Sequence, residues 1–153
     1  MSNTCKMNAP IVNDAFQFVR SLYKKYLPLG FRAFQLDQGM ELKNLCTSIG
    51  LRQGLSDDEM EILALAALLH NIGSIEGEFE NREVSKAIAE RYLQEQNYPV
   101  MDIFQVLACI AATRAESTPR TRLSGIIQAA KFSNVKGRDR KREKKDEVGD
   151  LWP

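Results

Sequence analysis

Apolar residues recur at every third or fourth position over most of the chain, which is the spacing of amphipathic helices. Between Leu42 and Ile49, for example, Leu45 and Cys46 complete an i, i+3, i+4, i+7 pattern. No segment alternates in the manner of a strand. We therefore predict an all-α fold, a compact bundle of five to six helices. The expected helices cover about residues 13–26, 37–53, 57–70, 82–97, 100–114 and 119–134.

Capping residues indicate where several of these helices begin. Ser56 and Glu59 have the spacing of a capping box, in which each side chain accepts a hydrogen bond from the other residue's backbone N–H. Asn13 and Asn81 are the expected N-caps of the first and fourth helices. Thr118–Pro119 is the expected cap and first turn of the sixth helix.

Glycine and proline indicate where the helices end. Pro28 and Gly30 are expected to end the first helix, and Gly54 the second. The segment 62–69 is apolar nearly all round, so we expect the third helix to lie in the middle of the core. Gly73 follows it and is expected to adopt a left-handed cap conformation.

The composition fits one globular domain. The chain has 153 residues, of which 44% are hydrophobic and 27% charged, and its net charge of +1 gives no global attraction to nucleic acid or membrane. No run approaches the roughly 20 apolar residues of a membrane span, and the first ten residues do not have the pattern of a signal peptide. The three cysteines form no CxxC pair; we expect Cys46 and Cys109 to be buried free thiols of a cytoplasmic protein.

The composition changes after residue 134. Seven basic and five acidic residues give the segment 135–153 a net charge of 7 − 5 = +2. We predict a helical domain over residues 1–134, followed by a charged tail. The tail is the only feature that favours binding to nucleic acid or an acidic partner. Its terminal apolar residues, with Trp152 among them, are candidates for docking on the same domain or on a second copy in a homodimer.

One motif suggests a family. The helix from Leu65 to Leu69 leads into His70-Asn71-Ile72-Gly73. This stretch resembles the signature of the HD-domain phosphohydrolases, where an apolar helix ends in a His-Asp pair followed by an aliphatic residue and glycine. Segments 34–38, 54–56, 81–85 and 123–131 resemble other parts of the family pattern in the correct order. The resemblance covers about residues 31–134 and implies a compact helical domain.

The family's catalytic residues are largely replaced. The resemblance places its metal ligands, a histidine, a His-Asp pair and a distant aspartate, at Gln38, His70, Asn71 and Lys131. An auxiliary histidine corresponds to Arg82. His70 is the only histidine in the sequence. Neutral amides and a lysine do not supply the anionic and imidazole ligands that a catalytic divalent ion needs. We therefore expect no metal and no other cofactor. Without a metal there is no activated water for hydrolysis by the family mechanism.

The two basic replacements, Arg82 and Lys131, allow two interpretations. In the first, they bind a phosphate or another small anion directly, since arginine and lysine are the usual phosphate-binding side chains. In the second, Lys131 forms an ion pair with Glu83 or Asp37 and fills the space vacated by the metal.

The other two residues of the motif are open to similar alternatives. His70 is either a remnant of the ligand set or a residue that stabilises the C-terminus of a helix. Asn71 either keeps the hydrogen bonds of the replaced aspartate or simply helps to end the helix. A metal site in an offset alignment would have to use Glu76, Glu78, Glu80 and Glu83, without a second histidine.

The function expected from the sequence is that of a non-catalytic HD-like domain. It would act as a regulatory or interaction module with a protein partner or a small anionic ligand, such as a nucleotide. The pocket residues would be Gln38, His70, Asn71, Arg82, Glu83 and Lys131. The alternative is a divergent metal-dependent phosphohydrolase acting on a nucleotide.

Overall fold

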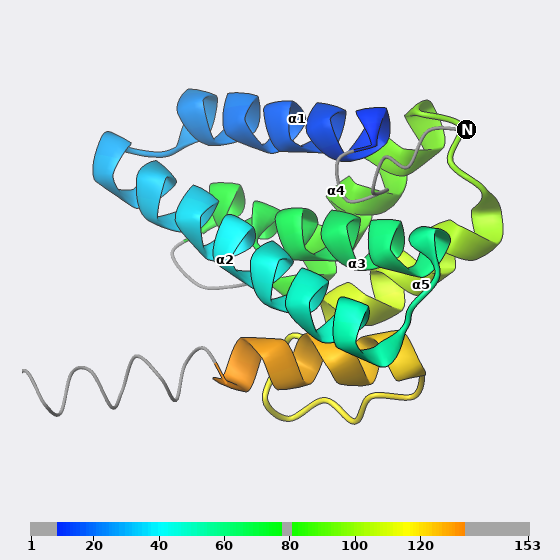
Figure 1. Cartoon of the computed structure of the whole chain (residues 1–153). Helices are drawn as coiled ribbons and strands as arrows, with labels where there is room; N and C mark the ends of the chain where they lie inside the picture. Colours follow the sequence, from blue (N-terminus) through cyan, green and yellow to red (C-terminus); the bar gives the residue numbers. More distant parts are fainter. Residues whose placement is uncertain (1–8, 78–80, 134–153) are drawn as a thin grey trace, which may run out of the picture.

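A computed structural model describes residues 9–77 and 81–133 (Figure 1). The described residues form helices and connections without a strand, so the predicted all-α class is confirmed. None of these helices is both long and apolar enough to cross a bilayer. The elements are α1 (Pro10–Tyr26), α2 (Leu29–Gln53), α3 (Asp57–Leu69), the 3₁₀ helix η2 (Ile72–Glu76), α4 (Arg82–Glu95), α5 (Val100–Ala111) and a last helix over residues 122–133.

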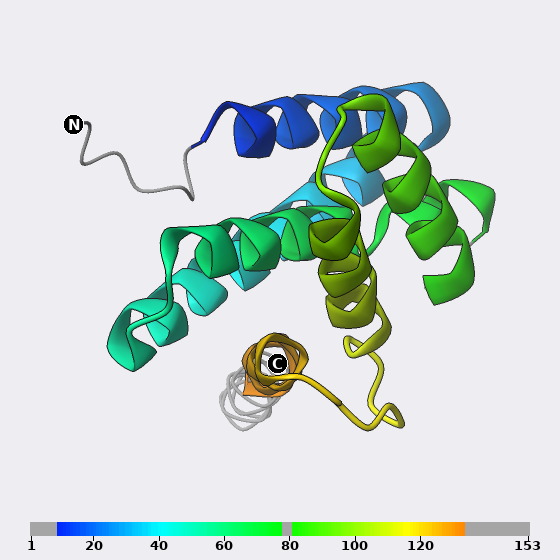
Figure 2. The ribbon, with the colours of Figure 1, turned by 90° about the vertical axis from the view of Figure 1, so that its right-hand side faces the viewer.

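Helix α3 is the centre of the bundle. Every residue from Met60 to Leu69 is buried, as the all-apolar pattern of 62–69 predicts. Helix α2 packs along α3, α1 lies on one side of this pair, and the last helix lies on the other (Figures 1 and 2). Helix α5 packs on the remaining side of α3, and α4 packs against α5 and η2.

Gly50 allows α2 to approach α3 closely. A Cβ atom at Gly50 would lie 2.3 Å from Sδ of Met60, whereas one at Gly39 would make an ordinary contact at 3.5 Å with the carbonyl oxygen of Ala67. Cys46 lies between these glycines and is fully buried, as is Cys109 on α5. The prediction that both thiols belong to the core is confirmed, whereas Cys5 lies outside the described residues.

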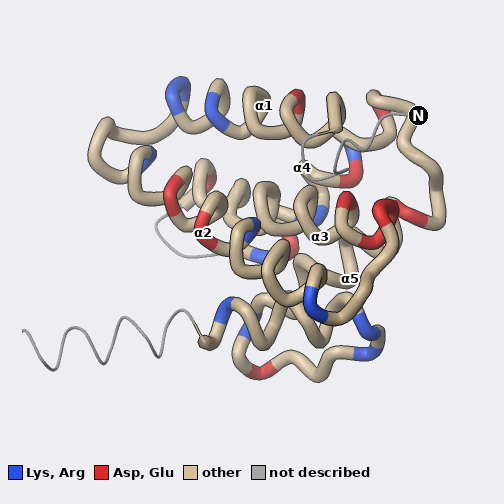
Figure 3. The backbone as a smooth tube through the Cα atoms, in the orientation of Figure 1, with Lys and Arg blue, Asp and Glu red and all other residues tan. Residues whose placement is uncertain are grey.

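Several predicted helix ends are confirmed. The Ser56 N–H donates to Oε1 of Glu59 at 2.9 Å, and the Glu59 N–H donates to Oγ of Ser56 at 3.2 Å. The acidic residues of this first turn of α3, drawn in red in Figure 3, also suit the positive end of the helix dipole. Asn81 caps α4 through a bond from the Val84 N–H to its Oδ1 at 3.1 Å. Gly54 ends α2 with φ 68°.

The predicted starts of α1 and α2 are wrong. Helix α1 begins at Pro10, so Asn13 lies inside it and Ala9 is the N-cap. Proline suits the first turn because its missing N–H has no intrahelical partner there. Helix α2 begins directly after Pro28, eight residues before Asp37. Pro28 is therefore the N-cap of α2, and Gly30 lies within α2.

Two further predictions of helix ends are also wrong. The last helix begins at residue 122, after Thr118–Pro119, because Thr121 and Ser124 bond reciprocally. The Ser124 N–H donates to Oγ1 of Thr121 at 3.1 Å, and the Thr121 N–H donates to Oγ of Ser124 at 2.9 Å. Gly73 does not adopt a left-handed conformation, since Gly54 is the glycine with positive φ in the described ranges. The predicted tail, 135–153, lies outside those ranges.

Candidate functional site

The motif residues meet where α3 ends. His70 is the C-cap of α3, Asn71 precedes η2, and Arg82 is the first residue of α4. These three residues are 1%, 3% and 2% exposed, respectively. Lys131, from the last helix, is half-buried and reaches the same place. Four of the six predicted pocket residues therefore come together, from three different helices and the turn after α3.

The imidazole of His70 lies between a carbonyl and an ammonium group. Its Nδ1 is 2.6 Å from the carbonyl oxygen of Ala67, and its Nε2 is 2.9 Å from Nζ of Lys131. A carbonyl can only accept, so Nδ1 carries the hydrogen and Nε2 accepts from the lysine. Burial, followed by the charges of Lys131 and Arg82, holds the pKa of His70 well below its usual range. The ring is therefore neutral, so it carries no positive charge with which to stabilise the C-terminus of the helix.

The guanidinium of Arg82 holds three segments together. Its Nη1 donates to the carbonyl oxygen of His70 at 3.3 Å and to Oδ1 of Asn71 at 3.2 Å. Its Nη2 lies 3.5 Å from the carbonyl oxygen of Thr113, just after α5. Asn71 thus keeps a polar contact inside the cluster. The planar shape of the guanidinium allows one side chain to serve the end of α3 and the end of α5.

Gly73 is needed for close packing rather than for an unusual φ. A Cβ atom there would lie 2.4 Å from the carbonyl oxygen of Asn81 and 2.9 Å from the backbone nitrogen of Ser85. The Gly73 N–H also donates to Oγ of Ser85 at 2.8 Å. The glycine of the motif therefore brings η2 against the start of α4, and this contact positions Arg82.

Glu83 does not point into the cluster. Its carboxylate forms an ion pair with Nζ of Lys86 at 3.0 Å and is 79% exposed. The expected pairing of Lys131 with Glu83 is therefore wrong, because consecutive residues of a helix face different directions and Arg82 faces inward. Asp37 is exposed on α2, and Gln38 is half-buried there.

One residue of the site escaped the sequence analysis. Thr113 contributes only a backbone carbonyl, for which a side-chain motif gives no signal.

The cluster is chemically a group of cations around a neutral histidine. Within residues 9–77 and 81–133, no three His, Cys, Asp or Glu side chains converge as a metal site would require. Of the alternative acidic ligands, Glu76 and Glu83 are exposed, while Glu78 and Glu80 lie outside the described residues. The only imidazole lone pair of the cluster is already bonded to Lys131.

Comparisons with protein-family models, curated proteins and solved structures found no match to this chain.

Proposed function

We propose that this protein is a non-catalytic, HD-like helical module with a regulatory or interaction role, and that its basic cluster receives a small anion. The observation that carries the proposal is the 2.9 Å contact between Nζ of Lys131 and Nε2 of His70. In the HD-domain family that the motif resembles, the residues that correspond to His70 and Lys131 would both face a metal ion.

The lysine is a substitute for the metal in charge and in position. An ammonium bonded to Nε2 occupies the lone pair that a divalent ion would need, and its charge repels such an ion. Arg82 adds a second positive charge nearby, and the pKa of His70 responds to both. These contacts support a site that has exchanged metal chemistry for fixed cations, which need no metal supply.

The two cations have different roles in this proposal. Arg82 is 2% exposed and bonded to oxygen atoms of the protein itself, so it stabilises the site. Lys131 is half-buried and is the cation that an entering anion would reach first. Phosphate oxygens suit an ammonium donor, so inorganic phosphate or the phosphate of a nucleotide is the proposed ligand class.

The proposal is tested by thermal unfolding with manganese chloride, with inorganic phosphate and with a panel of nucleotides, each added separately. A ligand that binds only the folded state raises the melting temperature by mass action. We expect a rise with phosphate or a nucleotide and none with manganese. The rise should disappear in Lys131→Met and persist in Lys86→Met, a matched control for a lysine paired on the surface.

Other outcomes would change the conclusion. A rise with manganese alone would favour the divergent phosphohydrolase. The absence of any rise would leave only an interaction through the surface, and the anion site would be wrong. We further propose a cytoplasmic location, because the buried thiols Cys46 and Cys109 suit a reducing compartment. A protein partner, a homodimer and nucleic-acid binding through residues 135–153 also remain proposals.

A further inference from the structure

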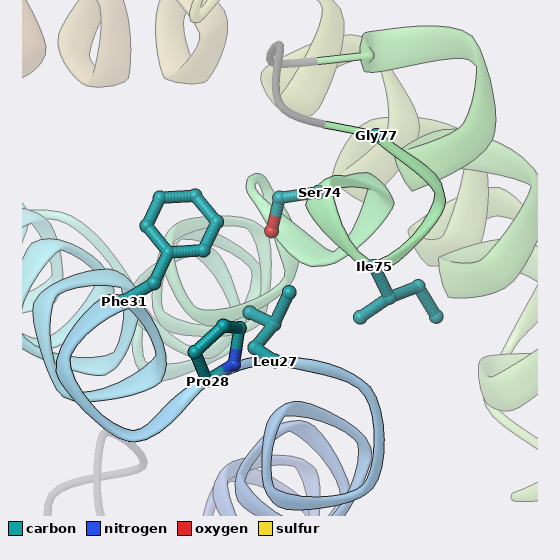
Figure 4. A pocket seen from close by; sticks show the side chains of 6 residues that line it. All are labelled: Leu27, Pro28, Phe31, Ser74, Ile75 and Gly77. Atoms are coloured by element: carbon teal, nitrogen blue, oxygen red, sulfur yellow. The ribbon is translucent and has the colours of Figure 1, made fainter.

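An apolar cavity of about 550 Å³ lies between the start of α2 and the 3₁₀ helix η2 (Figure 4). The connection from α1 to α2 forms one wall with Leu27 and Pro28, and Phe31 extends this wall from the first turns of α2. Ser74, Ile75 and Gly77 form the other wall. None of these six lining residues is charged. The cavity therefore differs in character from the cationic cluster, and its volume falls within the range of small-molecule sites.

One polar group of the cavity has no hydrogen-bond partner among the described residues. Ser74 is 3% exposed, and its Oγ atom makes no hydrogen bond within residues 9–77 and 81–133. In Figure 4 this oxygen points between Phe31 and Leu27, into the space that the apolar side chains surround. Buried hydroxyl groups nearly always have a partner, so an unsatisfied one in a cavity wall suggests that a ligand supplies it.

The apolar lining of the cavity favours a ligand whose remaining surface is apolar. Leu27 and Ile75 pack against the hydrophobic core, which gives the cavity a fixed base. The ring of Phe31 is half-buried and borders the cavity (Figure 4). An aromatic ring offers a partner ring offset-stacked or edge-to-face contact. The described residues that line the cavity carry no charge, which disfavours an ion, because an ion would lose its hydration without compensation.

We propose that this cavity binds a neutral aromatic molecule that carries one hydrogen-bonding group, with the ring against Phe31 and the polar group on Oγ of Ser74. This site is separate in its lining residues and in its ligand class from the anion site at Lys131. It does not depend on that proposal, and either can fail alone.

The probes are indole, whose N–H can donate to Ser74, and 1-methylindole, which has no such donor. Affinities are measured by isothermal titration calorimetry with the full chain and its variants. We expect Phe31→Ala to weaken both probes about tenfold, as loss of a principal apolar contact would. We expect Ser74→Ala to weaken indole by about fivefold and to leave 1-methylindole unchanged.

Phe34→Ala is the matched control, since Phe34 is on the same helix, is 53% exposed and does not line the cavity. Its affinities should equal those of the parent. Circular dichroism and the melting temperature establish that each variant is folded. The proposal is overturned if the parent binds neither probe at millimolar concentration. It is also overturned if folded Phe31→Ala binds both probes like the parent, or if Ser74→Ala affects the two probes equally.

Discussion

Nζ of Lys131 lies 2.9 Å from Nε2 of His70, a residue 61 positions earlier in the chain. The contact joins the last helix to the end of α3 and fixes the tautomer of the imidazole. It also places a positive charge on the side of the ring that a metal-binding histidine would turn to its ion. The protonation of His70 and the position of Lys131 are therefore linked.

The first prediction concerns the charge of His70. Because burial and the two cations lower its pKa, the folded protein should keep this ring neutral well below pH 6.5. The chain has a single histidine, so one imidazole resonance in proton NMR reports on it without assignment. Lys131→Met should raise the pKa of His70, although burial still keeps it below its usual value. A resonance that titrates near pH 6.5 in the parent would contradict this account.

The same shift predicts a loss of stability in acid. The unfolded chain takes up a proton on His70 near pH 6.5, whereas the folded chain does so only at lower pH. The contribution of His70 to stability is therefore complete above pH 6.5. It decreases below that pH by up to about 1.4 kcal/mol per pH unit, until the folded pKa is reached. Urea unfolding at pH 7.5 and 5.5 measures the difference, and His70→Gln should reduce it.

The second prediction concerns Arg82. Replacing it with alanine removes the donor to the His70 carbonyl and to Asn71 and leaves a cavity, so we expect a loss of about 3–5 kcal/mol in unfolding free energy. Arg82→Lys keeps the charge but not the planar fork and should lose about 1–3 kcal/mol. Arg91→Ala is the control, because Arg91 forms an exposed ion pair with Glu95 and should change stability by less than about 0.5 kcal/mol. Equal effects at both positions would argue against the role of Arg82.

The third prediction compares two glycines. Gly73→Ala places a Cβ atom 2.4 Å from a backbone oxygen, which the structure relieves only by moving η2 from α4; the expected loss is about 1–3 kcal/mol. Gly125→Ala meets nothing within 4 Å in the last helix and should gain up to about 1 kcal/mol from helix propensity. Chemical denaturation of both variants tests this opposite pair of signs.

The fourth prediction tests the family resemblance by restoring its ligands. The triple variant Gln38→His, Asn71→Asp, Lys131→Asp should bind manganese if these positions face one another as the resemblance implies. At a concentration about 100 times the dissociation constant, binding contributes about 2.7 kcal/mol, or roughly 5–10 °C in melting temperature for a chain of this length. The parent should show no shift. A folded triple variant without a shift would count against the alignment.

The fifth prediction concerns the thiols. Burial raises the pKa of Cys46 and of Cys109 to about 12, so neither forms a thiolate at neutral pH. Both should react with a thiol reagent such as Ellman's only when the protein opens, and both should react promptly in guanidinium chloride. Mass spectrometry of the labelled chain identifies the modified positions. Rapid labelling of Cys46 in the native protein would contradict its place between α2 and α3.

The helix class and the central position of α3 could be predicted because they depend on local patterns. A segment as apolar as 62–69 can satisfy its side chains only inside a core, and the Ser56–Glu59 box is a contact between near neighbours. The ends that were mispredicted depend on competition between signals. The last helix, for example, begins at the reciprocal hydrogen bonds of Thr121 and Ser124 and not at Thr118–Pro119.

The candidate site was only partly predictable for a related reason. The motif named His70, Asn71, Arg82 and Lys131, but no local rule relates residue 131 to residue 70. Glu83 points to the surface because α4 turns Arg82 into the core, and the side of α4 that is buried is set by tertiary packing. Every residue type has a backbone carbonyl, so the sequence gives no sign that the carbonyl of Thr113 lies next to Arg82.

The pairing of α2 with α3 has a consequence for the order of assembly. The two helices are consecutive and are joined by only three residues, 54–56, so their glycine-mediated contact closes a short loop at little entropic cost. We expect this hairpin to form early, with His70 at its far end. Lys131 comes from the last helix of the described chain, whose start is tied to the end of α2 by the bond from Arg122 to the Gln53 carbonyl. The charged cluster is thus completed only when that helix docks, so the full lowering of the pKa of His70 is reached only in the finished fold.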